Sequence, residues 1–259
     1  MQVWREKYLD LAVGWKLLLC LMNMKHGLTL SALGVLFGIH RTSSSRIFSA
    51  TLNVLYVATQ KCIKWFSRDL VQATMPPSFC VCYPNCRVIV DCSEGRIEIP
   101  VKVANRVNSW SNYNSDFTLK FLVGMSPSGY ITYISDVYWG RSSDTCYLVN
   151  SGLISLLEPA DMVTADKGFP RVKCDLESKD LTLVMPPFAK ANQQFTKAEM
   201  QKTYKVASNR THAERCIQRI KSFPILSKRL TLELKCHIDE AVHLCSVLAN
   251  TQGPVFKTV

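Results

Sequence analysis

The first 75 residues place apolar side chains at helical spacing. They predict a helix from Leu9 to Met24 that ends at Gly27, because glycine readily adopts the left-handed conformation found at helix C-termini. Thr29 is predicted to cap a second helix and Thr42 a third, since a hydroxyl at this position accepts a backbone N–H bond. The third helix is predicted to bury four apolar side chains on one face: Ile47, Ala50, Val54 and Val57. The N-terminal region is therefore expected to be all-helical.

Pro76 and Pro77 mark a change of pattern, because proline lacks an amide hydrogen and restricts the residue before it. Short apolar runs then predict strands at residues 87–91, 117–125, 130–137, 162–166 and 181–185. Helical patterns follow at 144–157 and 196–221, and the Pro-Ser-Gly sequence at 127–129 predicts a hairpin turn. Strands that alternate with helices indicate an α/β fold with a sheet flanked by helices.

The composition indicates a folded protein. Hydrophobic residues make up 47% of the 259 residues, which is enough for a substantial core and excludes wholesale disorder. The longest apolar run, residues 15–24, is far shorter than the roughly 20 residues that a membrane span requires, so no membrane partner is expected. Charged residues among the first ten also argue against a signal peptide.

The net charge of +11 is concentrated in two segments. Residues 1–75 carry nine Lys and Arg against three Asp and Glu, and residues 196–235 carry ten against three. The segment between them, 76–195, has 11 basic and 12 acidic residues and is nearly neutral. Basic surface at this density favours a polyanionic partner such as nucleic acid, although ordinary solubilising charge is the simpler alternative.

The eleven cysteines are an odd number spread through predicted strands and helices, so they do not form a disulfide framework. We expect reduced thiols, as in cytosolic or nuclear proteins. Cys80, Cys82 and Cys86 lie close together in the chain. Their spacing differs from the usual Cys-x₂-Cys pair and no fourth ligand is evident, so zinc is not expected there.

Two aspartates follow apolar runs and are candidates for a functional site. Asp91 and Asp166 are each predicted at the C-terminal end of a buried strand, where open α/β sheets hold functional side chains rigidly. A turn-forming or capping role is the alternative for either residue. Asp144 is a secondary candidate, but it begins a predicted helix, where capping of backbone N–H groups explains a carboxylate without a metal.

The predicted helix at 196–221 presents Arg210, Glu214 and Lys221 on one face, since their offsets of 0, 4 and 11 residues bring them within about 40° around a helix. An apolar stripe lies beside them: Val206, Ala213, Ile217 and Ile220. Glu214 is therefore expected at the edge of the surface on which this stripe packs. A surface ion pair between Arg210 and Glu214 is the alternative interpretation.

Several short motifs occur together in a recognisable order: VIVDCSE at 88–94, WSNY at 110–113, TLKFLVGMSPSGYITYIS at 118–135, GRSSD at 140–144, VTADKGF at 163–169 and NRTHAERCIQRIK at 209–221. In this order they resemble the Harbinger/PIF-type DDE superfamily transposases, in particular the DDE endonuclease domains derived from transposons in animal genomes. The resemblance covers roughly residues 10–225.

The resemblance implies an RNase H-like fold, with a mixed sheet flanked by helices, in which three acids hold two Mg²⁺ or Mn²⁺ ions. Matched residue by residue, the acids are Asp91, Asp166 and Glu214. Such a pair of ions activates an attacking water or 3′-hydroxyl and stabilises the leaving oxygen. Arg210 and Lys221 are then expected to contact DNA phosphates beside the metals.

Residues 28–58 match the helix-turn-helix that precedes the catalytic domain in the same relatives. Arg41, Ser44 and Arg46 are expected at the start of its second helix, where such domains contact DNA. A helical hairpin that merely packs on the core is the alternative. Some relatives carry an additional N-terminal zinc finger that this sequence lacks, so a separate DNA-binding partner protein is a further expectation.

The expected protein is a nuclear, metal-dependent DNA endonuclease and strand transferase that acts on double-stranded DNA. The alternative is a domesticated DNA-binding protein that retains the fold and has lost catalysis. The expected organisation is a helical region (1–75), a linker (76–85), a DDE RNase H-like catalytic domain (86–225) and a C-terminal helical tail (226–259).

Overall fold

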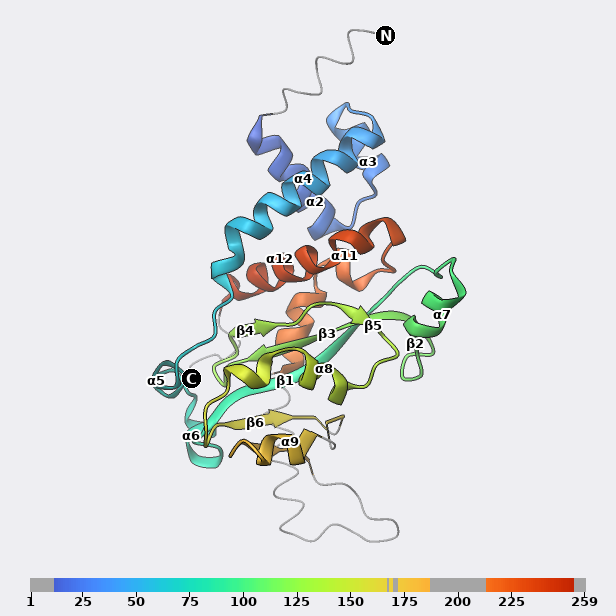
Figure 1. Cartoon of the computed structure of the whole chain (residues 1–259). Helices are drawn as coiled ribbons and strands as arrows, with labels where there is room; N and C mark the ends of the chain where they lie inside the picture. The colour runs from blue at the N-terminus through green and yellow to red at the C-terminus, as the bar shows by residue number, and fades with distance from the viewer. Residues whose placement is uncertain (1–11, 167, 170–171, 187–212, 254–259) are drawn as a thin grey trace.

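The computed structural model describes residues 12–166, 168–169, 172–186 and 213–253. The start of the first predicted helix and the part of the last predicted helix that holds Val206 and Arg210 lie outside these residues. Figure 1 shows a helical N-terminal region above a curved sheet, with the C-terminal helices between the two.

Three helices form the N-terminal region: α2 (Val13–His26), α3 (Leu30–Phe37) and α4 (Arg41–Thr59). As predicted, α2 ends at Gly27 in the left-handed conformation (φ 59°), and the Thr29 hydroxyl accepts a hydrogen bond from the amide of Ala32. Gly38 ends α3 in the same left-handed conformation (φ 64°), which lets the chain turn directly into α4. The two helices and the tight turn predicted within 28–58 are therefore present.

Helix α4 buries a different face from the one predicted. Ser44, Phe48 and Leu52 are buried, whereas Val54 and Val57 are 66% and 61% exposed. The predicted set and the buried set of side chains both fit the helical period. Helix α4 buries the set that faces α2, α3 and the C-terminal helix α12 (Ile238–Asn250). The cap also lies two residues earlier than predicted, because the His40 side chain, not that of Thr42, accepts the amide hydrogen bond.

The chain between α4 and the sheet is not extended. It forms the 3₁₀ turn η1 (Gln60–Cys62) and the short helices α5 (Arg68–Ala73) and α6 (Pro77–Cys82). The segment expected as a linker thus contains α6, which begins with a proline at its first position, where the missing amide hydrogen is of no consequence.

The described strands form one sheet of seven, in which the order along the main path is β2-β3-β1-β6-β7. Their bounds are β1 (Cys86–Arg96), β2 (Trp110–Ser111), β3 (Asp116–Met125), β4 (Ile131–Ile134), β5 (Tyr138–Trp139), β6 (Met162–Ala165) and β7 (Thr182–Val184). Strand β1 is antiparallel to β3 and parallel to β6, and β6 is parallel to β7. The predicted hairpin joins β3 to β4, with Gly129 at φ 84°.

Strand β1 is longer than the predicted strand at 87–91. It continues past Asp91 to Arg96 because β3 pairs with it along that whole length, from Ile89 with Met125 to Arg96 with Thr118. The parallel partner β6 is short and ends at Ala165, opposite Val90. Asp91 therefore lies inside β1, at the level where β6 ends.

Helices cover both faces of the sheet. The face of Val88 and Val90 packs against α8 (Asp144–Asn150), the 3₁₀ turn η2 (Leu153–Leu156) and α9 (Lys173–Glu177). The face of Ile89 packs against the helical residues 213–221, α11 (Pro224–Ser227) and α12. Two smaller elements lie at the surface, α7 (Val103–Ser109) and the 3₁₀ segment η4 (Leu232–His237).

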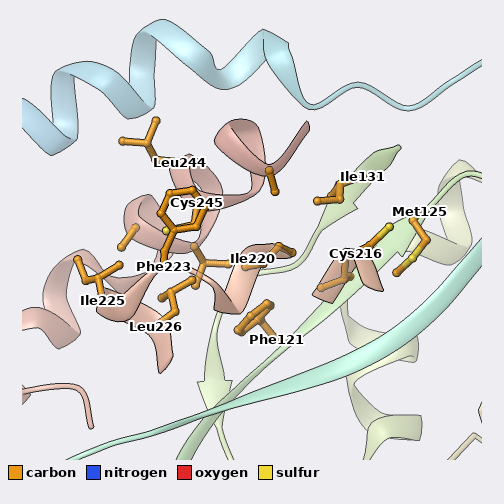
Figure 2. Packing of buried hydrophobic residues seen from close by; sticks show 14 of the residues in the cluster. Phe121, Met125, Ile131, Cys216, Ile220, Phe223, Ile225, Leu226, Leu244 and Cys245 are labelled. Atoms are coloured by element: carbon orange, nitrogen blue, oxygen red, sulfur yellow. The ribbon is translucent and has the colours of Figure 1, made fainter. Parts of the chain in front are cut away.

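The second of these cores joins the sheet to the N-terminal helices. Figure 2 shows Phe121 and Met125 of β3 facing Cys216 and Ile220 of the helical residues 213–221, with Cys245 of α12 above Ile220 in this view. Ala213 and Ile220 are buried as predicted. The same cluster includes Leu19 of α2 and Phe48 of α4, so residues 238–250, expected within a tail, are part of the core.

Three antiparallel strands followed by two parallel strands, flanked by helices and preceded by a helix-turn-helix, constitute an RNase H-like α/β fold. The predicted fold class is confirmed.

Candidate active site and nucleic-acid interface

The two candidate aspartates lie on β1 and directly after the end of its parallel neighbour β6. The parallel register pairs Ile89 with Thr164 and Val90 with Ala165, so the next positions are Asp91 and Asp166. Adjacent strands lie about 4.8 Å apart, and residues at the same register point to the same face. Both side chains are partly exposed. The fold therefore brings two residues that are 75 positions apart in the sequence to one edge of the sheet.

Asp91 faces the C-terminal helices. It alternates with Val90 and pairs with Val123, which packs in the cluster that contains Cys216 and Ile220. Asp166 has the same orientation, because Thr164, two positions earlier, contacts Cys86 of that cluster. The face on which the two aspartates lie is thus the face that residues 213–221 cover.

Lys221 of this helical segment carries its charge close to the carboxylates of Glu94 and Asp91. Burial lowers the pKa of Lys221, and the nearby charges of Glu94 and Asp91 partly oppose that effect. Glu214 is exposed and lies seven residues earlier, or about 10 Å along a helix axis at 1.5 Å per residue. At the Glu214 end, the Cys216 thiol donates to the carbonyl of Gly129, in the turn between β3 and β4 (3.2 Å).

The three predicted acids therefore do not form one close cluster of carboxylates. Among the residues that the structure describes, no group of three His, Cys, Asp or Glu side chains lies close enough to hold a metal ion. The strand register makes Asp91 and Asp166 neighbours, and Glu214 lies on the covering helix. Arg210 lies outside the described residues.

A half-buried ionic network lies on the other face of the sheet, beside the same edge. The Lys120 ammonium is 2.9 Å from the Glu94 carboxylate and 2.9 Å from that of Asp144. Glu94 also accepts hydrogen bonds from Asn114 (2.6 Å) and Thr118 (3.0 Å). Burial opposes the charge on Glu94, but bonds from Lys120, Ser111 and Asn114 outweigh it and lower the pKa of this carboxyl.

The same balance acts on Lys120. Its side chain is only 10% exposed, and burial alone would lower its pKa. Hydrogen bonds to Asp144 and Glu94 outweigh burial and raise the pKa instead. Sequence reasoning did not single out Lys120 or Glu94 as site residues. The available signal was a lysine in the apolar run of β3, with Glu94 as its cross-strand partner.

Asp144 does not have the predicted capping role. The N-cap of α8 is Ser143, whose hydroxyl accepts the amide hydrogen bond of Cys146 (3.3 Å). Asp144 is the first residue of the helix, and its carboxylate turns toward Lys120. A structural reason other than capping therefore holds this acid in place.

The helix-turn-helix exposes only some of the residues that are predicted to contact DNA. Arg46 is exposed near the start of α4. Arg41 is exposed but forms a two-pronged bond with Glu233 of η4, with both N–O distances at 3.1 Å. Ser44 is completely buried and its hydroxyl donates to the carbonyl of His40, so its burial does not support the predicted DNA contact.

The three clustered cysteines differ in their surroundings. Cys80 is exposed and Cys82 partly exposed, whereas Cys86 is buried at the start of β1. The Cys86 thiol lies 3.5 Å from the hydroxyl of Thr164, and burial raises its pKa to about 12. A thiol with so high a pKa stays protonated at neutral pH and is a poor metal ligand.

The chemistry of the adjacent aspartates fits a hard divalent cation. Mg²⁺ and Mn²⁺ prefer carboxylate oxygens and retain several waters, so a site can be built on few protein ligands. Two carboxylates at the same register of parallel strands supply such oxygens from one edge.

No helix in the described part of the chain is both long and apolar enough to cross a membrane.

Known families match both the N-terminal helical region and the region that contains the sheet. Residues 90–250 match the family model described as DDE superfamily endonuclease, and residues 10–61 match the helix-turn-helix of DDE superfamily endonuclease. No curated protein gives a significant match. The first match spans more than half of the chain and includes Asp91, Asp166 and Glu214, and the helix-turn-helix implies DNA binding. The chain belongs to the DDE superfamily endonucleases.

Proposed function

We propose that this protein is a Harbinger/PIF-type, transposon-derived DNA endonuclease and strand transferase that acts in the nucleus. Its proposed metal ligands are Asp91, Asp166 and Glu214, with Mg²⁺ or Mn²⁺ as the ions. The observation that carries the proposal is the register of β1 and β6, which sets Asp91 beside Asp166 at the edge of an RNase H-like sheet. Membership of the DDE superfamily endonucleases supports the same assignment.

The proposed roles of the side chains follow from their positions. Two bound divalent ions would lower the pKa of an attacking water or 3′-hydroxyl and stabilise the leaving oxygen. Asp91 and Asp166 hold their carboxylates on rigid backbone, so the phosphodiester is oriented with little rearrangement. Lys221, half-buried beside Asp91, supplies a positive charge for a DNA phosphate. Arg46 and Arg41 supply phosphate contacts from α4, Arg41 only after it leaves Glu233.

A second candidate function is DNA binding without catalysis. One observation favours it: among the described residues no three possible ligand side chains form a metal-binding group, and the charge of Lys221 lies close to Asp91. In this candidate the helix-turn-helix is the functional part, and the acids at the sheet edge are retained from a catalytic ancestor. The two candidates differ in one measurable property, namely metal-dependent cleavage.

The decisive experiment is a nicking assay on supercoiled plasmid DNA with Mn²⁺, with EDTA as the metal-free control. We expect the wild-type protein to nick DNA only with Mn²⁺, and Asp91→Asn, Asp166→Asn and Glu214→Gln each to abolish nicking. The matched control is Asp175→Asn, an exposed acid on α9 that lies outside the proposed site and is expected to retain activity.

The outcomes separate the candidates. Nicking that persists in Asp91→Asn would contradict the proposed site. DNA binding by the wild-type protein without any metal-dependent nicking would favour the second candidate. Loss of nicking in the two aspartate variants but not in Glu214→Gln would remove Glu214 from the site and leave the aspartate pair.

A further inference from the structure

The carboxylate of Asp144 lies between the two chain segments that carry the proposed catalytic aspartates. On the β1 side its charge lies close to the thiol of Cys92, the residue after Asp91, and burial together with this charge raises the pKa of that thiol. On the β6 side it faces Gly168, two residues after Asp166. A methyl group added to Gly168 would lie 3.3 Å from Cγ of Asp144 and would collide with its Oδ2 atom. One side chain thus contacts both segments.

Asp144 is itself held in place. Its Oδ1 atom is 2.9 Å from the Lys120 ammonium, and that ammonium is fixed in turn by Glu94 (2.9 Å) and lies 5.7 Å from the ring centre of Tyr147. With its side chain 10% exposed, Lys120 is poorly screened by solvent, so its charge interaction with Asp144 is stronger than that of a surface pair. Asp144 is therefore restrained by a fixed positive charge.

Capping of α8 does not require an acid at this position. Ser143 already caps α8, and the carboxylate of Asp144 is directed away from the helix toward Lys120. Glycine at 168 is explained by the same contact, since φ at this residue is not in the left-handed region and any side chain would meet Asp144. The three groups are thus mutually dependent: Lys120 holds Asp144, and Asp144 requires glycine at 168.

We propose that Asp144 is a positioning residue for the metal site. Held by Lys120, it fixes the backbone beside Asp91 and beside Asp166, and so sets the spacing of the two carboxylates and the affinity for the metal ion. This inference rests on the proposed function. Residues that orient metal ligands in this indirect way change metal affinity by about 10- to 100-fold when they are substituted.

The test compares Asp144→Asn with Ser143→Ala by calorimetric titration of the purified full-length protein with Mn²⁺. Asp144→Asn keeps the shape of the side chain and removes its charge, and it is expected to weaken Mn²⁺ binding by about 10- to 100-fold. Ser143→Ala removes the cap of the same helix without touching Lys120 or Gly168. It is expected to lower the melting temperature while Mn²⁺ affinity stays within about twofold of wild type.

Nicking kinetics give a second readout that a purely structural role would not change. In Asp144→Asn, the Mn²⁺ concentration for half-maximal nicking should rise by the same factor as the dissociation constant, with KM for DNA unchanged. Lys120→Arg, which keeps the charge, should retain more Mn²⁺ affinity than Lys120→Met, which removes it.

Gly168→Ala tests the contact between Asp144 and Gly168 from the glycine side. This variant replaces Asp144→Asn as the test if Asp144→Asn does not fold. The added methyl group should displace the backbone next to Asp166 and weaken Mn²⁺ binding. Adding Asp144→Ala removes the collision, so the double variant should lose less affinity than the sum of the two single losses.

Wild-type Mn²⁺ affinity in folded Asp144→Asn or Gly168→Ala, alongside lost binding in Asp166→Asn, would overturn this inference and leave the proposed function intact. Equal losses in Asp144→Asn and Ser143→Ala would also overturn it, since general destabilisation would then explain both. A wild-type protein that does not bind Mn²⁺ at all would overturn the proposed function, and this inference with it.

Discussion

The two ends of the parallel pair β1 and β6 carry charge in opposite ways. Where the strands begin, Arg87 and Asp161 are both buried, with side chains 2% exposed, and Asp161 bonds to Arg68 of α5 at 2.9 Å. Where β6 ends, two acids occupy neighbouring positions, Asp91 and Asp166. Opposite charges compensate one another at the first end, whereas like charges repel at the second. The first end therefore stabilises the fold, and the second end is the one to which the proposed function assigns chemistry.

The largest expected effect on stability is at the beginning of the strands. Asp161→Asn keeps the side-chain shape but leaves Arg87 buried beside a neutral group, and loses the charge that Arg68 contacts. We expect the free energy of unfolding to fall by about 3–5 kcal/mol, the usual cost of breaking a buried pair. Urea denaturation measures this loss.

The control at that end is Glu158→Gln. The Glu158 side chain is 56% exposed and 3.4 Å from Arg87, and its removal should cost no more than about 1 kcal/mol. A loss below 1 kcal/mol in Asp161→Asn as well would contradict the structural role of this end.

The ionic network beside the site gives an intermediate effect that depends on pH. The pKa of Glu94 is lowered in the folded protein, so its contribution to stability is complete above the unfolded pKa of about 4.3 and is lost as the pH falls through the lower folded value. The Glu94→Gln variant should be less stable at neutral pH, and its stability should fall less steeply below about pH 4.5. Thermal melts from pH 7 to 3 measure both effects, and parallel curves for the two proteins would contradict the role of Glu94.

The smallest effect concerns the helix-turn-helix, where a paired arginine and an exposed one can be compared. Arg46→Ala should reduce the log–log salt dependence of DNA binding by about 0.9 if Arg46 neutralises one phosphate. Arg41→Ala should reduce it less, because Arg41 must first leave Glu233. Fluorescence anisotropy with duplex DNA at several salt concentrations measures the slopes. Equal reductions would show that the pair with Glu233 does not compete with DNA.

Much of the fold could be predicted because its signals are local. Gly27, Thr29 and the Pro-Ser-Gly turn each determine backbone geometry within a few residues, and all three have their predicted roles. The face that α4 buries could not be predicted, since Ile47, Val54 and Val57 fit the helical period as well as Phe48 and Leu52 do. Packing against α12, almost 200 residues later in the chain, selects between the two faces.

The candidate site shows the same limit. The sequence places Asp91 and Asp166 at strand positions, but their adjacency depends on the register of β1 with β6. Lys120 was not predicted because a lysine within a strand gives no sign of its partners until Glu94 and Asp144 are brought to it from β1 and α8. The covering helix likewise brings the charge of Lys221 close to Glu94 and Asp91, which the sequence does not show.

The most direct test of the central claim is a pair of measurements on Asp166→Asn, namely its melting temperature and its affinity for Mn²⁺ by calorimetry. If the end of β6 serves chemistry, the substitution removes a repulsive charge and costs little stability. The melting temperature should then equal or exceed that of the wild-type protein, and Mn²⁺ binding should be lost. A variant that melts several degrees lower and still binds Mn²⁺ with wild-type affinity would show that Asp166 stabilises the fold, and would contradict the account.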